Sequence, residues 1–234
     1  MDYQKNQKYF DSNDKHFYVG LGILALGVVL FALTVFFDVR FMPFQEALIM
    51  IIVAAGAAVA FVPRSLRSNE NDLDTYVLQK CDKYDEIVVS EKNITDLITR
   101  RLKPVIVGDY VFEGENFVYR KGKDDRRYRS PIYKASALIF TEAGIYVSTK
   151  TFSLIDANEK EDVSQFVYED MDGLSTAEGE LPLPDGSKIR TCFIVFSENG
   201  KEALRIPAKR GAETDRLCDD VNRYISDVKK ASRR

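Results

Sequence analysis

The chain has 234 residues, of which 45% are hydrophobic and 29% charged, and its formal net charge is −3. This length suits a short membrane segment plus one ordinary domain. A slightly acidic chain has no bulk attraction for nucleic acid, so no nucleic-acid partner is expected.

Two long runs without a charged residue predict a pair of membrane-spanning helices after an N-terminal tail of residues 1–16. The first run, Phe17–Phe37, has the roughly 20 apolar residues that a helix needs to cross a hydrocarbon core of about 30 Å. We predict spans over residues 17–37 and 43–62, within a transmembrane hairpin of residues 17–63. Pro43 suits the first helical turn, where its missing N–H has no partner to lose, and Pro63 closes the second span.

Small residues in the second run predict close packing of the two helices. Residues four apart on a helix share a face, and small side chains there let another backbone approach. The short connection between the runs also leaves the helices side by side. The candidate helix-packing residues are Ala54 with Ala58, and Gly56 with Ala60.

Basic residues near the spans predict the orientation of the hairpin. They are concentrated before the first span and after the second, and only Arg40 lies between them: Lys5, Lys8, Lys15, Arg64 and Arg67. Because cytoplasmic flanks carry the excess of Lys and Arg, both termini are expected to be cytoplasmic. The chain is therefore expected to be a multi-pass protein of the cell membrane.

Apolar residues at three- and four-residue spacing predict a helical linker over residues 68–103. One such stretch runs from Leu73 to Val88 and another from Ile94 to Leu102. The polar segment Ser90–Asn93 leaves open whether they form one kinked helix or two. Pro104 stops helix formation behind it.

From residue 104 onward, short β-branched and aromatic runs alternate with turn residues, which predicts a compact antiparallel β fold. The seven runs are Val105–Phe112, Phe117–Arg120, Tyr133–Thr141, Ile145–Leu154, Val163–Tyr168, Ile189–Phe196 and Glu202–Ile206. After Pro207, apolar residues from Leu217 to Val228 form one face of a closing helix. The predicted fold class is α+β, with a β domain over residues 104–234 that ends in this helix.

Seven strands followed by one helix is the order of a pleckstrin-homology-like (PH-like) domain. The segment Thr141–Tyr146 resembles the T-x-x-G-I/L hairpin of bacterial membrane-anchored PH-like domains, and Phe166–Leu174 resembles a strand of those domains with an aromatic, tyrosine and acidic run. The resemblance covers roughly residues 105–226. It implies a PH-like antiparallel β-barrel or sandwich with a C-terminal helix, and a hairpin of membrane helices commonly precedes such domains.

The densest positive charge lies in Arg120–Arg129, where six basic residues and two acidic ones surround a predicted turn. Cations on such a turn can surround a phosphate, and a glycine lets the backbone approach it. The pattern also resembles the headgroup-binding loop of lipid-binding PH domains. The candidate lipid- or phosphate-binding residues are Lys121, Lys123, Arg127 and Arg129. The alternative is a solvated turn whose charge is partly neutralised by Asp124 and Asp125.

The sequence predicts no catalytic residue, no metal site and no cofactor. The signatures GxGxxG, GxxxxGK[ST], GxSxG and HExxH are absent. Cys81, Cys192 and Cys218 lie far apart and the only histidine is His16, so the ligand pairs of structural zinc are missing. The acidic run Glu169–Gly173 lacks the ligand spacing of a calcium loop.

The expected function is that of a non-enzymatic, membrane-anchored binding or scaffold module that acts on a protein or lipid at the cytoplasmic membrane face. Its expected partners are the bilayer, an anionic lipid headgroup, and a protein partner or a second copy of the chain. The alternative is a regulatory or signalling membrane subunit whose hairpin senses the bilayer or associates with a transporter.

Overall fold

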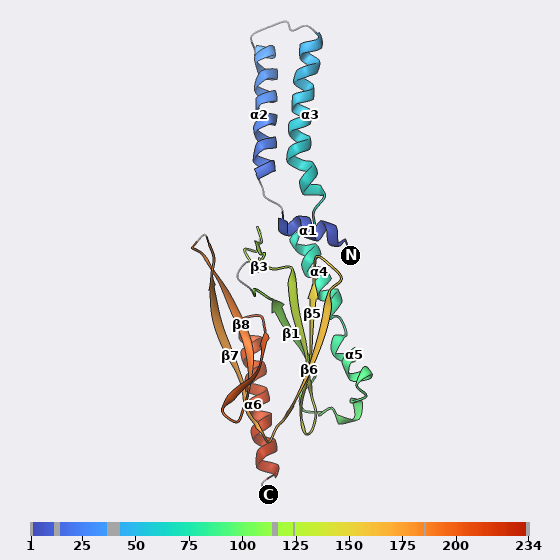
Figure 1. Ribbon diagram of the computed structural model, residues 1–234, viewed down its shortest axis with the longest axis vertical. Coiled ribbons are helices and arrows are strands. Elements are labelled where there is room, and N and C mark those ends of the chain that lie inside the picture. The colour runs from blue at the N-terminus through green and yellow to red at the C-terminus, as the bar shows by residue number, and fades with distance from the viewer. Residues whose placement is uncertain are drawn as a thin grey trace. The chain divides into compact units, whose positions relative to one another are not determined.

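The computed structural model describes residues 2–11, 15–36, 43–113, 117–123, 125–184 and 186–232. The chain divides into two compact units, Met1–Leu73 and Asp74–Arg234 (Figure 1). Residues 74–103, predicted as part of a linker, therefore group with the sheets of the second unit.

The first unit is helical. It contains α1 (Tyr3–Asp11), α2 (Lys15–Phe36) and α3 (Pro43–Ser65), and α4 (Glu70–Cys81) begins in it. Helix α1 lies in the segment predicted only as a tail, and it buries Asn6, Tyr9 and Phe10. The backbone N–H of Ser68 donates to the carbonyl of Lys5 at 3.2 Å, so α1 is joined to the chain that follows α3.

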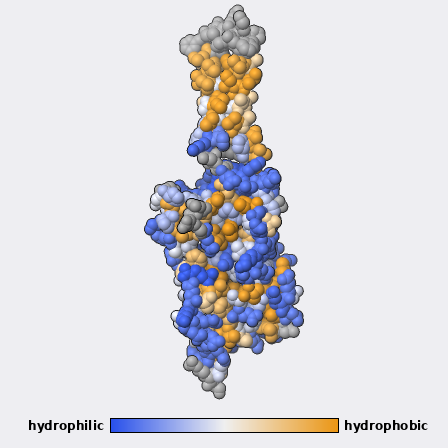
Figure 2. All heavy atoms as spheres, viewed as in Figure 1, coloured by the Kyte–Doolittle hydropathy of each residue, from blue (hydrophilic) through white to orange (hydrophobic). Residues whose placement is uncertain are grey.

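Helices α2 and α3 pack against each other through small residues. A Cβ on Gly56 would collide with the backbone of Leu24, and a Cβ on Gly20 would collide with the backbone of Ala60. Both contacts therefore need glycine, as the predicted close packing of the two helices requires. On the face that Figure 2 shows, apolar side chains cover most of this hairpin.

The four predicted helix-packing residues lie on two different faces of α3. Gly56 and Ala60 are buried, whereas Ala54 and Ala58 are exposed. Each residue turns a helix by about 100°, so positions two apart lie about 200° apart. Only one of the two predicted pairs can therefore face α2, and that pair is Gly56 with Ala60.

Two antiparallel sheets form the framework of the second unit (Figure 1). The four-stranded sheet has the order β1-β4-β5-β6 and consists of β1 (Val105–Tyr110), β4 (Ile132–Phe140), β5 (Gly144–Ser153) and β6 (Glu159–Val167). The three-stranded sheet has the order β7-β8-β9 and consists of β7 (Met171–Pro182), β8 (Lys188–Glu198) and β9 (Lys201–Pro207). Between β1 and β4 in sequence lies a small hairpin of β2 (Arg120–Lys121) and β3 (Tyr128–Arg129). Helix α6 (Ala212–Ser232) follows β9.

The predicted α+β class with antiparallel sheets and a C-terminal helix is confirmed, but the sheets do not close into a barrel. In the described part of the chain, no strand pairs from one sheet to the other. One reason lies at the edge of β7, where a side chain takes the place of a strand. The Asn222 amide on α6 accepts from the N–H of Leu174 at 2.7 Å and donates to its carbonyl at 2.8 Å.

The predicted strands differ from the structure in three places, and the first is the short strand β3, which lies outside all seven predicted runs. Strand β7 was not predicted, because it is rich in Ser, Thr and Glu and because a register shift between Met171 and Gly173 breaks its alternation. It pairs with β8 alone, and α6 packs against it. The predicted run Phe117–Arg120 is irregular except at Arg120, which begins the short strand β2.

The helical segment resolves into two helices, α4 and α5 (Tyr84–Glu91), that break earlier than Ser90–Asn93. The break is at Asp82–Lys83, where Lys83 has a φ of 54°. Residues 94–102 do not form a regular helix, and only the short 3₁₀ helix η1 (Thr95–Leu97) lies there. Ile98 instead forms a β-bridge with Thr141, so tertiary pairing overrides the helical spacing of this stretch.

The core of the second unit lies between the two sheets and α6. The predicted apolar face of the closing helix is confirmed, since Val221, Tyr224 and Ile225 are buried and Leu217 and Val228 pack against the core. Helix α5 covers other residues of β4 and β5, where Tyr84 and Val88 pack with Ala137, Ile139 and Tyr146.

Candidate functional site

The predicted basic turn is the β2–β3 hairpin and the residues that join its strands. The N–H of Gly122 donates to the carbonyl of Arg127 at 2.8 Å, which closes the turn. A Cβ on Gly122 would collide with the Asp125 carboxylate, so a larger residue here would require the Asp125 side chain to move. Asp124, which was expected to weaken the positive charge, lies outside the described residues.

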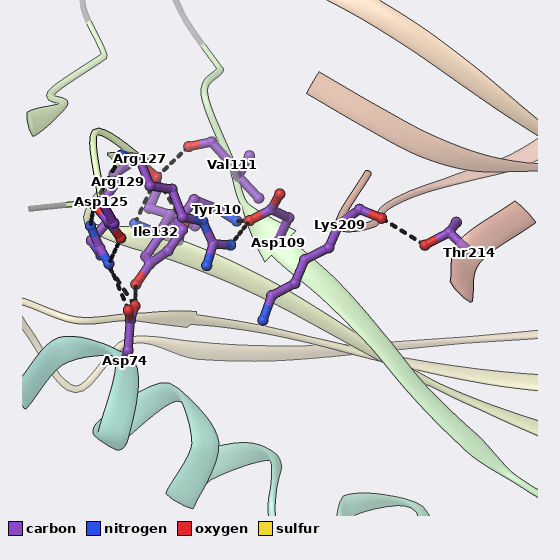
Figure 3. Close-up of polar contacts among 11 residues, drawn as sticks. Asp74, Asp109, Tyr110, Val111, Asp125, Arg127, Arg129, Ile132, Lys209 and Thr214 are labelled. Atoms are coloured by element: carbon purple, nitrogen blue, oxygen red, sulfur yellow. Dashed lines mark hydrogen bonds and ion pairs between the residues drawn. The ribbon is translucent and has the colours of Figure 1, made fainter. Parts of the chain in front are cut away.

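Arg129 is buried inside an internal ion-pair network, with only 1% of its side chain exposed (Figure 3). Its guanidinium donates to both carboxylate oxygens of Asp74, at 3.1 and 2.6 Å, and to both of Asp125, at 3.2 and 2.7 Å. The hydroxyl of Tyr110 donates to Asp74 at 2.8 Å. Arg129 therefore joins α4 to the turn, and its donors are already engaged by two carboxylates.

The pKa values of this network follow from its hydrogen bonds. Burial alone would raise the pKa of Asp74, but the bonds from Arg129 and Tyr110 outweigh burial and lower it. The hydrogen bond from Arg129 lowers the pKa of Asp125. Burial would lower the pKa of Arg129, yet its two carboxylate partners raise it above the ordinary arginine value. All three groups are therefore charged at neutral pH.

Arg127 is also engaged within the protein, although less completely than Arg129. One guanidinium nitrogen donates to Asp109 at 2.5 Å, and the guanidinium carbon lies 5.2 Å from the centre of the Tyr110 ring. The side chain of Arg127 is 31% exposed, so one side of it still faces solvent. Arg127 can therefore contribute charge to a ligand while Asp109 holds its orientation.

Lys121 and Lys123, the other two candidate residues, are exposed on the same turn. The ammonium of Lys121 lies 5.1 Å from the centre of the Tyr128 ring. The structure thus brings all four predicted residues to one hairpin, but it turns Arg129 into the protein and leaves the lysines at the surface.

A cavity of about 320 Å³ beside the turn gathers cations from distant parts of the chain. Arg126 and Arg127 come from the turn, Lys188 and Arg190 from β8, and Arg210 from the connection to α6. The other lining residues are Asp109, Phe112, Tyr128, Ile189 and Cys192. We call this cavity the basic pocket.

Acidic residues neutralise part of the basic pocket. Glu180 pairs with Lys188 at 2.6 Å and more distantly with Arg190, at 3.8 Å. Glu178 pairs with Arg210 at 2.8 Å. These three pairs are about half exposed, so they bind their cations only weakly. With Asp109, three carboxylates face five cations, which leaves an excess of two positive charges.

Arg126 differs from the other cations of the basic pocket. It is exposed, and the described part of the chain supplies no ion pair to it. Its φ of 55° is unusual for arginine and belongs to the tight turn. Arg126 is thus the cation of the pocket that is best placed to meet an external anion.

Sequence reasoning missed the basic pocket because its cations lie up to about 80 residues apart. One local signal was available: Lys188 and Arg190 are two residues apart in a strand, so they share a face. That pattern predicts a short basic stripe, but it does not predict which turn the stripe will meet.

The cysteines form no disulfide, and burial explains their state. Cys192 and Cys218 are buried, and burial raises the pKa of the Cys218 thiol to about 11. Such thiols remain protonated at neutral pH and are poor nucleophiles. Within the described residues, no group of three or more His, Cys, Asp and Glu side chains is placed to hold a metal ion.

Comparison with known proteins adds no family to this geometry. No protein-family model, curated protein or solved structure matches the chain. A functional assignment therefore rests on the residues and contacts of the chain itself.

Proposed function

We propose that this chain is a non-enzymatic, membrane-anchored binding module whose second unit is PH-like and holds a phosphate-bearing anionic headgroup at the cytoplasmic membrane face. The observation that carries this proposal is the basic pocket, where five cations converge on one cavity. Guanidinium groups bind phosphate through two parallel hydrogen bonds, and four of these five cations are arginines.

Helices α2 and α3 support the membrane anchor. Their most apolar windows, Lys15–Leu33 and Glu46–Pro63, each have a mean hydropathy of 2.2. Only 11% and 17% of these windows are buried within the protein, whereas the core helix of a soluble protein is mostly buried. A bilayer would remove the remaining apolar side chains from water, and both helices are long enough to cross it.

The order of the sheets supports the PH-like proposal. A four-stranded antiparallel sheet precedes a three-stranded one, and the helix α6 follows them. The turn Thr141–Gly144, which carried part of the resemblance, joins β4 to β5, and the Thr141 hydroxyl donates to the carbonyl of Gly144 at 2.8 Å.

Because the chain is tethered to the membrane, even a weak contact is sufficient for the basic pocket to bind a headgroup. A tether raises the local concentration of the headgroups, so little intrinsic affinity is needed. Each basic residue near an anionic surface contributes about 1 kcal/mol, and the exposed Lys121 and Lys123 extend the positive surface of the turn. The net charge of −3 opposes this attraction over the chain as a whole.

The test uses the full chain in lipid nanodiscs of phosphatidylcholine, with and without phosphatidylserine. Hydrogen exchange of the segments 125–130 and 186–192 should slow when the anionic lipid is present, and high salt should reverse the effect. The double variant Arg126→Gln/Arg190→Gln should lose this protection. The matched control Lys160→Gln/Arg223→Gln removes two exposed cations outside the pocket and should keep it.

Inorganic phosphate in detergent solution distinguishes a free anion from a lipid. Protection by phosphate alone, with none from phosphatidylserine nanodiscs, would assign the pocket to a soluble ligand. Equal exchange in neutral and anionic nanodiscs would contradict the headgroup proposal. A chain that stays in aqueous solution without detergent would contradict the anchor.

A further inference from the structure

Strand β1 lies at an edge of the four-stranded sheet, and β4 is its one partner there. The N–H of Val111 donates to the carbonyl of Ile132 at 3.0 Å, which makes these two residues a hydrogen-bonded pair just beyond the strand. Such pairs alternate along an antiparallel ladder. The backbone groups of Ile106, Gly108 and Tyr110 therefore point away from β4.

The described contacts agree with this alternation. The outward N–H of Tyr110 donates to the carboxylate of Asp109 at 2.8 Å, and not to β4. Among the described residues outside the β1–β4 ladder, none forms a hydrogen bond with the backbone N–H or carbonyl of Ile106 or Gly108. The edge thus offers two N–H groups and two carbonyls at the spacing of a β ladder.

These groups lie along a cavity of about 570 Å³. Side chains alternate between the two faces of a strand, so a cavity on one face would be lined by every second residue. Here the consecutive residues Val105–Gly108 all line it, which places it along the backbone edge. Its apolar walls include Val77 and Leu78 on α4 and Leu217 on α6. We call it the β1 groove.

The other sheet edges carry protection that β1 lacks. Strand β6 has four charged residues in succession, Glu159–Asp162, and β9 carries Lys201, Glu202 and Arg205. The edge of β7 is occupied by the Asn222 amide. Charged residues and covering elements are the usual means of preventing strand addition. Among the described edges, β1 is the one whose first four residues, Val105–Gly108, are uncharged and open to a groove.

We propose that the β1 groove binds an extended peptide of a partner protein, which adds to the sheet as a strand beside β1. This function goes beyond headgroup binding at the basic pocket. Backbone groups of the peptide pair with Ile106 and Gly108, and alternate apolar side chains contact Leu78 and Leu217.

Charge at the rim of the groove defines the peptide further. Lys209 lines the groove, and no ion pair to Lys209 is found within the described residues. The same holds for Glu213, which also lines the groove. A peptide with an acidic residue opposite Lys209 and a basic residue opposite Glu213 complements both charges.

The shape of the groove favours a single peptide strand over a second copy of the chain. Paired strands lie about 4.8 Å apart, so both edges must be able to approach each other. In a symmetric dimer, each β1 would lie between α4 and α6 of its own chain, and the two recesses would face each other. A lone extended chain can enter such a recess without this obstruction.

The first part of the test selects binders from a phage-displayed library of random dodecapeptides on the full chain in detergent micelles. Leu78→Glu places a charge in the groove wall at a side chain that is 67% exposed, so the variant should fold. Its matched control is Ile87→Glu, a change at a 48% exposed position on α5 outside the groove. Selected peptides should bind Leu78→Glu at least tenfold more weakly and Ile87→Glu with unchanged affinity.

The second part tests strand addition. Each selected peptide is synthesised with N-methyl groups on either its odd or its even backbone amides. Because alternate N–H groups of a strand point to one side, one set should weaken binding at least tenfold and the other by less than twofold. The N–H groups of Ile106 and Gly108 should also become protected from hydrogen exchange.

Three results would overturn the proposal. The first is that no peptide is enriched in the selection. The second is that the selected peptides bind Leu78→Glu as tightly as the parent chain, and the third is that both sets of N-methyl groups weaken peptide binding equally. Self-association that Leu78→Glu abolishes would assign the groove to a second copy and would also overturn it. Loss of anionic-lipid protection at the basic pocket would leave this inference unaffected.

Discussion

Replacing Arg129 by methionine should destabilise the second unit by about 3 kcal/mol. Removing one partner of a buried ion pair typically costs about 3–5 kcal/mol, because the remaining charge is left without a partner. Here the remaining carboxylates of Asp74 and Asp125 are 36% and 44% exposed, so water can solvate them in part. The expected loss therefore lies at the lower end of that range.

Arg205→Met is the matched control. Arg205 makes the same two-point contact with Glu202, at 2.9 and 2.7 Å, but the two side chains are 47% and 44% exposed. Exposed pairs contribute little to stability because water solvates and screens both charges, so this variant should be nearly as stable as the parent. The contrast compares a buried guanidinium that binds two carboxylates with an exposed one that binds a single carboxylate.

The measurement is urea unfolding of the full chain in detergent micelles. Hydrogen exchange of the buried segment Ala135–Ile139 reports the unfolding of the second unit.

The pH dependence of the stability difference supplies a second readout. The pKa values of Asp74 and Asp125 are lowered in the folded protein, so their contribution is complete above the unfolded pKa of about 3.9. The difference between parent and Arg129→Met should shrink as pH falls below about 4. A difference of less than 1 kcal/mol between Arg129→Met and Arg205→Met at pH 7 would refute the reasoning.

Two further predictions concern the helix contacts. Gly56→Leu should separate α2 from α3, because even a Cβ there collides with Leu24, whereas Ala58→Leu on the exposed face should not; cross-linking yield between the helices measures both. Asn222→Leu should destabilise the second unit by about 1–3 kcal/mol and accelerate hydrogen exchange at Leu174, and unchanged exchange there would contradict the role of Asn222 at the β7 edge.

Elements with a strong local pattern were predictable from the sequence. The uncharged runs mark α2 and α3, because about 20 consecutive apolar residues are typical of a long helix. The turn Glu198–Gly200 lies between two of the predicted runs, and Asn199 and Gly200 adopt the positive φ values of 51° and 73° that Asn and Gly tolerate. In α6, the helical spacing predicted the buried residues Val221, Tyr224 and Ile225.

Elements that depend on distant partners were not predictable. Residues 94–102 have helical spacing, yet Ile98 pairs with Thr141, and a bridge between such distant residues leaves no trace in a local period. The strand β7 was missed because Ser, Thr and Glu residues give it no clear apolar alternation, and it forms by pairing with β8.

The sequence by itself determined where apolar and charged side chains concentrate, and hence the two apolar helices, the β-rich region and the basic turn. Only the tertiary structure decided how those charges are used. It buries Arg129 between Asp74 and Asp125, and it brings Lys188 and Arg190 to Arg126. The physical reason is that periodicity is a property of neighbours in the chain, whereas an ion pair needs two groups that only strand pairing and helix packing bring within about 4 Å.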